Sequence, residues 1–417
     1  MREMKDSGIE WIGEIPDEWN LVQTKRFFKN TKKIVGTEAD KYDRLALTLN
    51  GVVKRSKDDS EGLQPEKFEG YQILRKNELV FKLIDLENVK TSRVGLSPYT
   101  GLVSPAYIVL SNDLEDNRFF YYWFMFMYYN EVFNHLGGEG VRSALNAKDV
   151  LSLPVLDIES DKQRRIADYL DRKCSQIDDI IARQQEVIEK LKAYKLSVIT
   201  EAVTKGLNPD VPMKDSGVEW IGEIPEHWEV MRFGRCAAIK SNLVAPDDYA
   251  DYPQISPDSI EKNSGRILEY KTVKESGVIS WNHLFFKGQI IYSKIRPMLN
   301  KVAIAPFDGL CSADMYPIET NNNTQFLVYM MLSDYFTSQV GLVTENRVKM
   351  PKINQNELGA IMVTIPPQIE QETISKYLLE KCSSVDAVID KKQGLIDKLD
   401  DYKKSLIYEV VTGKKEV

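Results

Sequence analysis

The residue types that most often perform catalysis are sparse in this chain and form no recognisable reactive set. Three histidines and four cysteines are present, and the cysteines lack the spacing of a structural zinc site. The run Gly413-Lys414-Lys415 lacks the upstream glycine and the hydroxyl residue of a phosphate-binding loop, and no glycine-rich dinucleotide fingerprint occurs. The Pro-Pro pair at 366–367 is not followed by the aromatic residue of an adenine-methyltransferase motif. The sequence therefore predicts a binding protein that is not an enzyme and holds no metal.

Lysines and arginines are the residues whose chemistry points to a ligand, because they suit phosphates and guanine edges alike. Two groups, Lys54–Lys57 and Lys294–Lys301, are predicted to lie on loops beside turns. For each cation taken singly, a solvated surface charge is the alternative interpretation. If the ligand is DNA, the candidate contacts are Lys54, Arg55, Lys57, Lys82, Arg93, Arg142, Lys294, Arg296, Lys301, Arg347, Lys349 and Lys352.

The net charge of −7 argues against a dense cationic surface. Residues 20–150 and 229–357 are close to neutral, so the acidic excess lies outside them. DNA binding would then need local patches or a basic partner.

The longest apolar run, residues 119–129, is far shorter than the roughly 20 residues that cross a bilayer. Together with a polar N-terminus, these features lead us to expect a cytoplasmic protein with reduced thiols.

The organisation that must position the cations is a duplication. Residues 4–16 recur as residues 213–225 with 12 of 13 identities, and residues 166–204 align on residues 374–412 with 19 of 39 identities. The segments between these matching ends have diverged almost completely. Each half is therefore predicted to contain a tryptophan motif, a variable globular middle and a long helix. The tryptophans of the motifs (Trp11, Trp19, Trp220, Trp228) are most simply anchors on a neighbouring surface.

Heptad periodicity predicts that both repeated end segments are coiled-coil helices. Apolar residues recur in two interleaved rows over about five heptads. Gly206 and Gly413 are placed to end the helices. Lys195 and Lys403 interrupt the rows. They could set the register or face a partner, or they could be solvated side chains at a fraying helix end. One helix cannot bury its seam alone, so we expect the two to pair antiparallel within the chain. The predicted seam residues are Leu170, Ile177, Ile181, Ile188, Leu191, Val198, Leu378, Val385, Ile389, Ile396, Leu399 and Leu406.

Short β-rich runs broken by Gly, Pro and Asn predict a mixed α and β fold for each middle. Residues 77–82 and 288–294 are expected to be matching strands, and apolar helices are expected near 119–133 and 326–335. The predicted fold class is α+β. Two similar mixed α/β domains would be separated by two long helices that form an antiparallel coiled coil with internal pseudo-two-fold symmetry. One domain would then lie at each end of a rod.

The doubled Trp-Ile-Gly-Glu-Ile-Pro segment, taken with the duplicated helices, resembles the specificity subunit of type I restriction-modification systems. Residues 163–167 and 371–375 resemble the family's entry into its conserved helices. Residues 47–53 resemble the first stretch of many of its target recognition domains. The resemblance spans the whole chain. One departure is that residues 154–158 lack the double proline that precedes the second helix.

The resemblance implies a subunit with no catalytic site and two target recognition domains, each reading one half of a split, asymmetric DNA sequence. The paired helices would fix the gap between the halves and dock two methyltransferase subunits. Restriction subunits, which are translocase-nucleases, could join for cleavage. S-adenosylmethionine, ATP and magnesium would belong to these partners.

The implied domain organisation has four parts. Residues 1–157 hold the first recognition domain and 158–206 the first helix. Residues 207–365 hold the linker, the repeated motif and the second recognition domain, and 366–417 the second helix and tail. The alternative hypothesis is a two-headed coiled-coil adaptor whose heads bind proteins, which the near-neutral middles favour.

Overall fold

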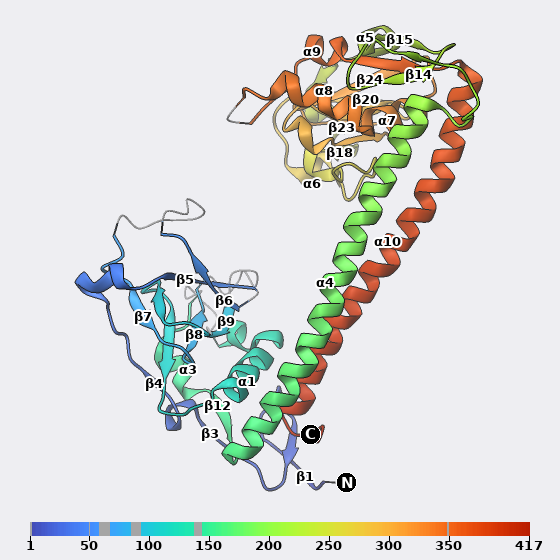
Figure 1. The fold of residues 1–417 in the computed structure, drawn as a ribbon. Coiled ribbons are helices and arrows are strands. Elements are labelled where there is room, and N and C mark those ends of the chain that lie inside the picture. The colour runs from blue at the N-terminus through green and yellow to red at the C-terminus, as the bar shows by residue number, and fades with distance from the viewer. Residues whose placement is uncertain (1, 50, 58–66, 85–92, 137–143, 348–349) are drawn as a thin grey trace. The chain divides into compact units, whose positions relative to one another are not determined.

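The computed structural model describes residues 2–49, 51–57, 67–84, 93–136, 144–347 and 350–417 (Figure 1). The chain divides into two compact units, one made of Met1–Arg183 with Gly394–Val417 and one made of Gln184–Gln393. Each unit contains one mixed α/β head, one tryptophan motif and part of each long helix. The predicted α+β class with two long helices is confirmed. The linear domain boundaries given above stay a prediction, since each helix is shared between the units.

The strands of the first unit are β1 (Met4–Asp6), β2 (Glu14–Pro16), β3 (Asn20–Gln23), β4 (Lys29–Asn30), β5 (Arg44–Thr48), β6 (Gly51–Arg55), β7 (Gln72–Leu74), β8 (Leu79–Lys82), β9 (Arg93–Leu96), β10 (Gly101–Val103), β11 (Ile108–Ser111) and β12 (Pro154–Asp157). Its helices are α1 (Arg118–Tyr129), α2 (Val132–His135), α3 (Ala147–Ser152), the first part of α4 (Ser160–Lys205) and the last part of α10 (Gln368–Val411). Short 3-10 turns lie at Thr24–Arg26 and Gly36–Lys41.

The strands of the second unit are β13 (Met213–Asp215), β14 (Glu223–Pro225), β15 (Glu229–Arg232), β16 (Ala237–Ile239), β17 (Leu243–Val244), β18 (Pro253–Ile255), β19 (Lys271–Thr272), β20 (Asn282–Phe285), β21 (Ile290–Ser293), β22 (Val302–Ile304), β23 (Gly309–Cys311), β24 (Met315–Thr320) and β25 (Met362–Ile365). Beside its parts of α4 and α10, the helices are α5 (Phe233–Cys236), α6 (Val273–Ser276), α7 (Thr324–Leu332), α8 (Asp334–Thr344) and α9 (Gln355–Ala360). Its 3-10 turns are Pro246–Tyr249, Pro257–Ser259 and Pro297–Leu299.

The two heads share one topology despite their unlike sequences. The described strands of the first head pair in the orders β6-β5-β10-β7 and β4-β11-β8-β9. The second head repeats them as β19-β18-β23-β20, with β17 added at the edge, and as β16-β24-β21-β22. Even the parallel pair recurs, as β5 with β10 and as β18 with β23. This confirms the predicted match between residues 77–82 and 288–294, which contain β8 and β21.

Each head packs its sheets against apolar helices that the sequence predicts only in part. In the first head the α1 ring of Phe124 meets Phe81 of β8 edge-on at 5.0 Å, and the buried Trp123 donates its indole N–H to the Pro154 carbonyl at 2.9 Å. The apolar segments expected as single helices are each two helices. Glu131, with φ 54°, separates α1 from α2, and the extended Ser333 separates α7 from α8.

The tryptophan motifs are hairpins that dock on helix ends. In the first, β1 pairs with β2 and the buried Trp19 lies against Gly413, where α10 has just ended. Gly413 has φ +76°, and a Cβ there would lie 2.5 Å from Pro16 and 2.7 Å from the Trp19 ring, so a glycine is required. In the second copy, Gly206 follows α4 and faces Trp228 in the same way. The predicted anchoring role is confirmed for Trp19 and Trp228.

The other tryptophan of each motif differs between the copies. Trp11 is half-buried, with its ring centroid 5.7 Å from that of Phe126, and Phe126 also stacks on Tyr408 at 5.2 Å. Trp220 is 44% exposed, so the anchoring prediction is wrong for it. Trp11 lies against the Phe126 ring, whereas no aromatic ring within the described chain pairs with Trp220.

The long helices pair antiparallel within each unit. In the first unit Lys403 of α10 donates its Nζ to Asp178 of α4 at 2.6 Å. In the second, Lys195 of α4 donates to Asp386 of α10 at 2.7 Å, and Lys392 donates to Gln184 at 2.9 Å. Since Asp178 aligns with Asp386 and Lys195 with Lys403, the same ion pair is built twice. The predicted antiparallel pairing is confirmed inside both units.

Burial along the helices follows the heptad pattern. All twelve predicted seam residues are buried or half-buried, and most positions between them are exposed. The seam continues into the core of each unit, where Leu170 and Cys174 join Leu406 and Val410 in the first and Ile199 joins Leu378 in the second. Lys195 and Lys403 are therefore not solvated stems, because each is held by a carboxylate across the seam.

The two equivalent ion pairs differ in burial, which gives a matched test. Replacing Asp386 with alanine should lower the free energy of unfolding by about 3 kcal/mol, because the Lys195 side chain, only 7% exposed, would keep a charge without a partner. Asp178→Ala removes the same partner from Lys403 where the carboxylate is 54% exposed, and should cost less than about 1 kcal/mol. Denaturant titrations followed by circular dichroism measure both losses. Equal losses would contradict this assignment.

Candidate nucleic-acid interface

The first predicted group of cations lies on a strand and its exit, not on a loop. Lys54 and Arg55 belong to β6, which pairs antiparallel with β5. The exposed Lys54 donates to Asp43 at 2.6 Å and lies 5.3 Å from the Tyr99 ring centroid. That hydrogen bond lowers the pKa of Asp43. The loop prediction failed because the alternation that continues through Arg55 extends the hairpin beyond the Gly51 turn.

Three further first-head candidates, Arg55, Lys57 and Arg93, also interact with neighbours. Lys57 donates to the Ala39 carbonyl at 2.8 Å and lies 3.8 Å from Asp40. Lys82 and Arg93 face each other in the register of β8 and β9. Arg55 and Arg93 have interaction partners as well. Arg142 lies outside the described residues.

In the second head, the structure joins two groups that are far apart in sequence. Lys294 and Lys352 approach the same carboxylate, Asp314, at 4.0 and 3.0 Å. The backbone fixes this arrangement, since Arg296 N–H donates to the Pro351 carbonyl at 2.8 Å and Ile353 N–H donates to Lys294 at 2.9 Å. The 294–301 and 347–352 groups therefore contribute to one surface.

Two further second-head candidates are neutralised locally. Lys301 donates to the Pro257 carbonyl at 2.7 Å and lies 3.4 Å from Asp258. Arg347 grips both carboxylate oxygens of Glu357, and this hydrogen bonding lowers the pKa of Glu357. Lys349 lies outside the described residues.

Arg296 differs from these residues because it is held by its backbone and not by a counter-ion. It adopts the left-handed conformation with φ 45°, as does Asn300 with φ 42°, and the two bracket the Pro297–Leu299 turn. The buried Asn300 side chain donates to the Met331 carbonyl at 2.9 Å, which fastens the turn to α7. The Arg296 side chain is exposed and forms no ion pair within the described ranges. A non-glycine residue kept in this conformation at a surface is typical of functional sites.

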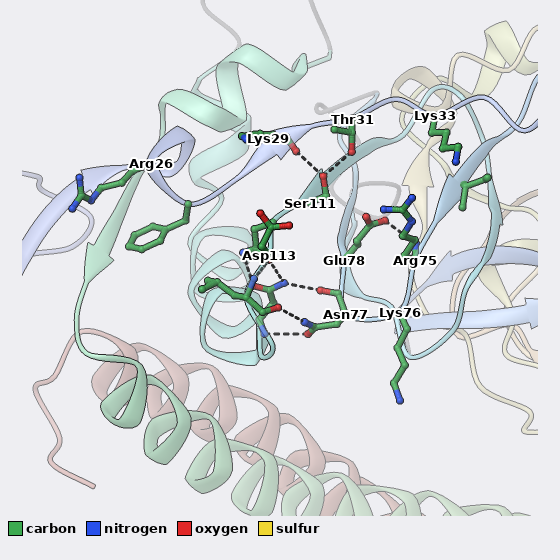
Figure 2. A pocket seen from close by; sticks show the side chains of 15 residues that line it. Arg26, Lys29, Thr31, Lys33, Arg75, Lys76, Asn77, Glu78, Ser111 and Asp113 are labelled. Carbon is green, nitrogen blue, oxygen red and sulfur yellow. Dashed lines mark hydrogen bonds between the residues drawn. The ribbon is translucent and has the colours of Figure 1, made fainter.

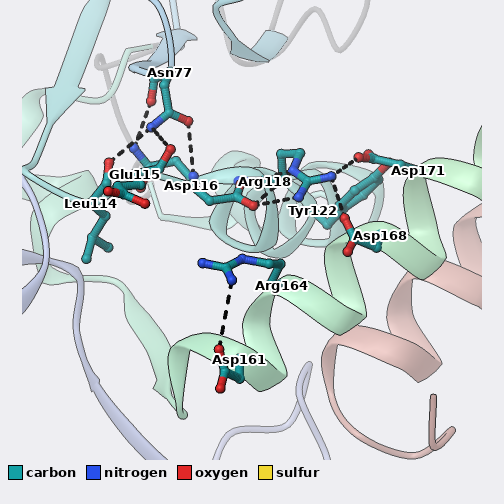
Figure 3. Close-up of polar contacts among 11 residues, drawn as sticks. Asn77, Leu114, Glu115, Asp116, Arg118, Tyr122, Asp161, Arg164, Asp168 and Asp171 are labelled. Atoms are coloured by element: carbon teal, nitrogen blue, oxygen red, sulfur yellow. Dashed lines mark hydrogen bonds and ion pairs between the residues drawn. The ribbon is translucent and has the colours of Figure 1, made fainter.

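The first head is fastened to α4 by a charged network that sequence reasoning missed (Figure 3). Arg118, at the start of α1, contacts Asp116 at 2.6 Å and reaches Asp168 and Asp171 of α4 at 2.8 and 2.6 Å. Tyr122 adds a hydroxyl donated to Asp171 at 2.7 Å. The hydrogen bonds that the Arg118 guanidinium donates to Asp116 and to both α4 carboxylates raise its pKa, so its charge is permanent. No local sequence signal links residues 53 positions apart.

The second head uses uncharged groups for a comparable junction. Gln371 of α10 donates to Asn322 at 3.0 Å and accepts from the Asn323 backbone at 2.9 Å. Ser375 adds a hydroxyl donated to Asn323 at 3.0 Å. Both junctions fix the orientation of a head on the helix that follows it, which is what accurate positioning of binding side chains requires.

A second set missed by the sequence reasoning consists of cations around a hollow of about 860 Å³ on the first head (Figure 2). Its basic residues are Arg26, Lys29, Lys33, Arg75 and Lys76. The run Lys25-Arg26-Phe27-Phe28-Lys29-Asn30-Thr31-Lys32-Lys33 was the available signal, because five of its nine residues are basic. The second contributor, Arg75-Lys76, is brought beside it only by the fold.

The structure offers little for redox or metal chemistry in its described part. The four cysteines are buried and free, and burial raises the pKa of Cys174 to about 11. Among the described residues, no three His, Cys, Asp or Glu side chains are grouped as metal ligands. The described helices include none that could span a membrane.

Comparison with known proteins agrees with the geometry. Residues 225–400 match the family model described as type I restriction modification DNA specificity domain. The EcoDI specificity subunit of Escherichia coli is 33% identical over 281 residues, which are 64% of this chain and 63% of that subunit. The putative MjaX specificity subunit of Methanocaldococcus jannaschii is 23% identical over 97% of this chain and 95% of its own length. The match to the EcoDI subunit thus spans less than two thirds of that protein.

One solved structure shares the fold along most of the chain. It is described as the structural basis underlying complex assembly and conformational transition of the type I R-M system, and has a TM-score of 0.64, 12% identity and coverage of 95% of this chain and 98% of its own. The doubled motif, the paired helices, the two heads of one topology and the matches to named specificity subunits lead to one assignment. Residues 225–400 carry the type I restriction modification DNA specificity domain, and the chain is similar to type I specificity subunits along most of its length.

Proposed function

We propose that this chain recognises a two-part, asymmetric DNA sequence, with one half-site read by each head, within a type I restriction-modification complex. The observation that carries the proposal is that the two heads share the order of their common strands but carry different polar side chains at matching positions, such as Ser111 and Glu319. The fold is thus kept while the groups that could read bases are changed, as two unlike half-sites require. Charged side chains supply both phosphate and base contacts in such interfaces.

The helices support the further proposal that they set the unread gap between the half-sites. α4 and α10 each run without interruption through parts of both units. At about 1.5 Å per residue, a helix of 46 residues is roughly 70 Å long, or about two turns of B-DNA. A helix pair locked by repeated ion pairs is stiff enough to act as a ruler.

We also propose that the chemistry belongs to partner subunits. Two methyltransferase subunits would dock on the helical frame and bind S-adenosylmethionine, and translocase-nuclease subunits would bring ATP and magnesium. In this proposal the chain supplies recognition and geometry, and no group of its own takes part in methyl transfer.

The adaptor alternative has one specific observation in its favour. Lys54, Lys301, Arg347 and Lys352 are ion-paired with carboxylates of their own head, which reduces their attraction for DNA phosphates. The match of residues 225–400 to a DNA specificity domain favours DNA over protein as the ligand of the heads. Binding of random duplex DNA, measured with and without the methyltransferase subunits, separates the two hypotheses.

The main test is methyl transfer. The chain alone should transfer no methyl group from S-adenosylmethionine to DNA. Combined with its methyltransferase subunits, it should direct adenine methylation to a single two-part sequence with unlike halves, mapped by long-read detection of modified bases in the host genome. Methylation that does not depend on this chain, or that maps to a site without an unread gap, would contradict the proposal.

Arg296 is the residue we expect to read a base in the second half-site. Arg296→Ala should reduce discrimination against one changed base pair in that half-site by about tenfold to a hundredfold, because one bidentate contact contributes about 1–3 kcal/mol. Arg347→Ala is the matched control, since its guanidinium is already occupied by Glu357. Competition binding with single-base variants of both half-sites measures the effect. Equal loss at the two half-sites would contradict the assignment.

If the helices set the unread gap, lengthening them should change the gap between the half-sites without changing the base sequence of either half-site. Inserting one heptad into α4 and one into α10, at the level of the Gln184–Lys392 hydrogen bond, keeps the seam in phase. The added length of about 10 Å should lengthen the unread gap by about three base pairs. Mapping the methylated motif of the variant checks this. A changed base sequence in either half-site, or an unchanged gap between them, would refute the proposal that the helices set the gap.

A further inference from the structure

The hollow on the first head combines cations from two separate segments of the chain. Arg26 ends the first 3-10 turn, Lys29 begins β4, and Lys33 follows three residues after β4. Arg75 and Lys76 form the turn between β7 and β8 on the facing side. Figure 2 shows these side chains around one opening, which is also lined by Thr31 and Ser111. The arrangement gathers positive charge that is dispersed along the sequence.

The charge of the hollow is largely free of ion pairs, unlike that of most predicted contacts. Arg26 contacts Asp157 at 3.1 Å. Lys29, Lys33, Arg75 and Lys76 form no ion pair with any described residue, and the three lysines are exposed. The two acidic lining residues, Glu78 and Asp113, form no ion pair with these cations in the described chain. Burial raises the pKa of Glu78, whose carboxylate accepts the Arg75 backbone N–H at 2.7 Å, and Asp113 lies exposed at the edge.

The floor of the hollow is rigid. Asn112 and Asn117 exchange side-chain hydrogen bonds at 2.8 and 2.9 Å. Asn117, which is buried, also donates to the Asn77 carbonyl at 2.7 Å, and its backbone N–H donates to the Asn77 side chain at 3.1 Å. Asn77 itself has φ 69°, so these bonds hold a left-handed residue in the turn that carries Lys76. The cations are therefore mounted on a fixed base.

The matching place in the second head shows that the shared fold does not need these cations. The registers Leu79–Leu110 and Ile290–Ile318 align Ser111 with Glu319 and Glu78 with Gln289. Lys240 then occupies the position of Thr31. There Lys240 donates to Glu319 at 2.7 Å and Gln289 donates to Glu319 at 2.6 Å, so the cation is neutralised. The free positive charge is a property of the first head.

We propose that this hollow binds the phosphodiester backbone of the DNA duplex. Through it, the first head would supply most of the salt-dependent part of the affinity of the complex for DNA. The inference rests on the proposed function, which it deepens by naming a phosphate site. Lysines have long, flexible side chains. At the open edge of the hollow they suit the distributed charge of a duplex, which carries one phosphate per about 1.7 Å of helix axis. Phosphate contacts position a protein on the duplex without reading bases. The site would therefore fix the register of the head on the DNA, and other residues would recognise the base sequence.

The test uses the full chain assembled with its methyltransferase subunits and a fluorescent duplex that contains the mapped target. In the variant K29Q/K33Q/K76Q, the slope of log K against log salt between about 50 and 200 mM should fall by about 2.7, since each phosphate contact contributes about 0.9. Affinity at the lower salt should fall by about tenfold to a hundredfold. Preference for the target over a duplex with one altered half-site should not change.

Two matched variants separate the site from bulk charge and from folding. K262Q/K271Q/K274Q removes the same charge from exposed positions of the second head and should leave the slope nearly unchanged. K29R/K33R/K76R keeps the charge and should retain the wild-type slope. Equal loss in both glutamine variants, or loss in the arginine variant, would overturn the proposal.

The remaining outcomes separate this inference from the proposed function. A wild-type complex that shows no preference for the mapped target would overturn both. A wild-type complex that binds specifically, together with a K29Q/K33Q/K76Q variant of unchanged slope, would overturn the hollow alone. Loss of the methyltransferase subunits from that variant during gel filtration would also overturn it, because the hollow would then be a contact for an acidic protein surface.

Discussion

The rest of the structure depends on the burial of two apolar stripes that no single helix could hide. α4 and α10 carry heptad rows of Leu, Ile and Val, and within each unit the stripe of one helix is covered by the stripe of the other. Hydrophobic burial drives the two helices together but does not by itself determine their register. Two equivalent Lys–Asp pairs across the seam add the register, because shifting either helix by one turn would strand a partly buried charge. Each head is then built onto a helix whose position is already fixed.

The chain's internal similarity follows from this arrangement. The helical segments are 19 of 39 identical because each is the other's partner, so a change on one side must suit the other. The motifs are 12 of 13 identical because both must fit a glycine-ended helix terminus, at Gly413 and at Gly206. The heads bury their aromatic residues among themselves, so only their strand order had to persist. Divergence is concentrated where no second copy constrains the surface.

The same distinction explains what could be predicted from sequence. The helices, their antiparallel pairing and the glycine stops follow from periodic local patterns that directly report burial. The candidate site follows much less well. Lys54 lies in a strand because hairpin pairing extends past its turn, and Lys294 meets Lys352 through backbone bonds between distant segments. Arg118 and the hollow depend on contacts between elements, which no spacing rule records. Trp220 shows that even a repeated motif acquires a different environment, since it is 44% exposed while Trp11 lies against Phe126.

Charge pairing is what separates structural cations from available ones in this protein. A lysine that already holds a carboxylate at 2.6 Å, as Lys54 does, must give up that contact before it gains a phosphate, and the exchange of one surface ion pair for another yields little. Lys29, Lys33 and Lys76 form no such contact within the described chain, so counter-ions alone are displaced when DNA approaches, and their release favours binding. The negative net charge of the whole chain is thus compatible with DNA recognition. What matters is where positive charge is left uncompensated, and that is decided by the fold of each head.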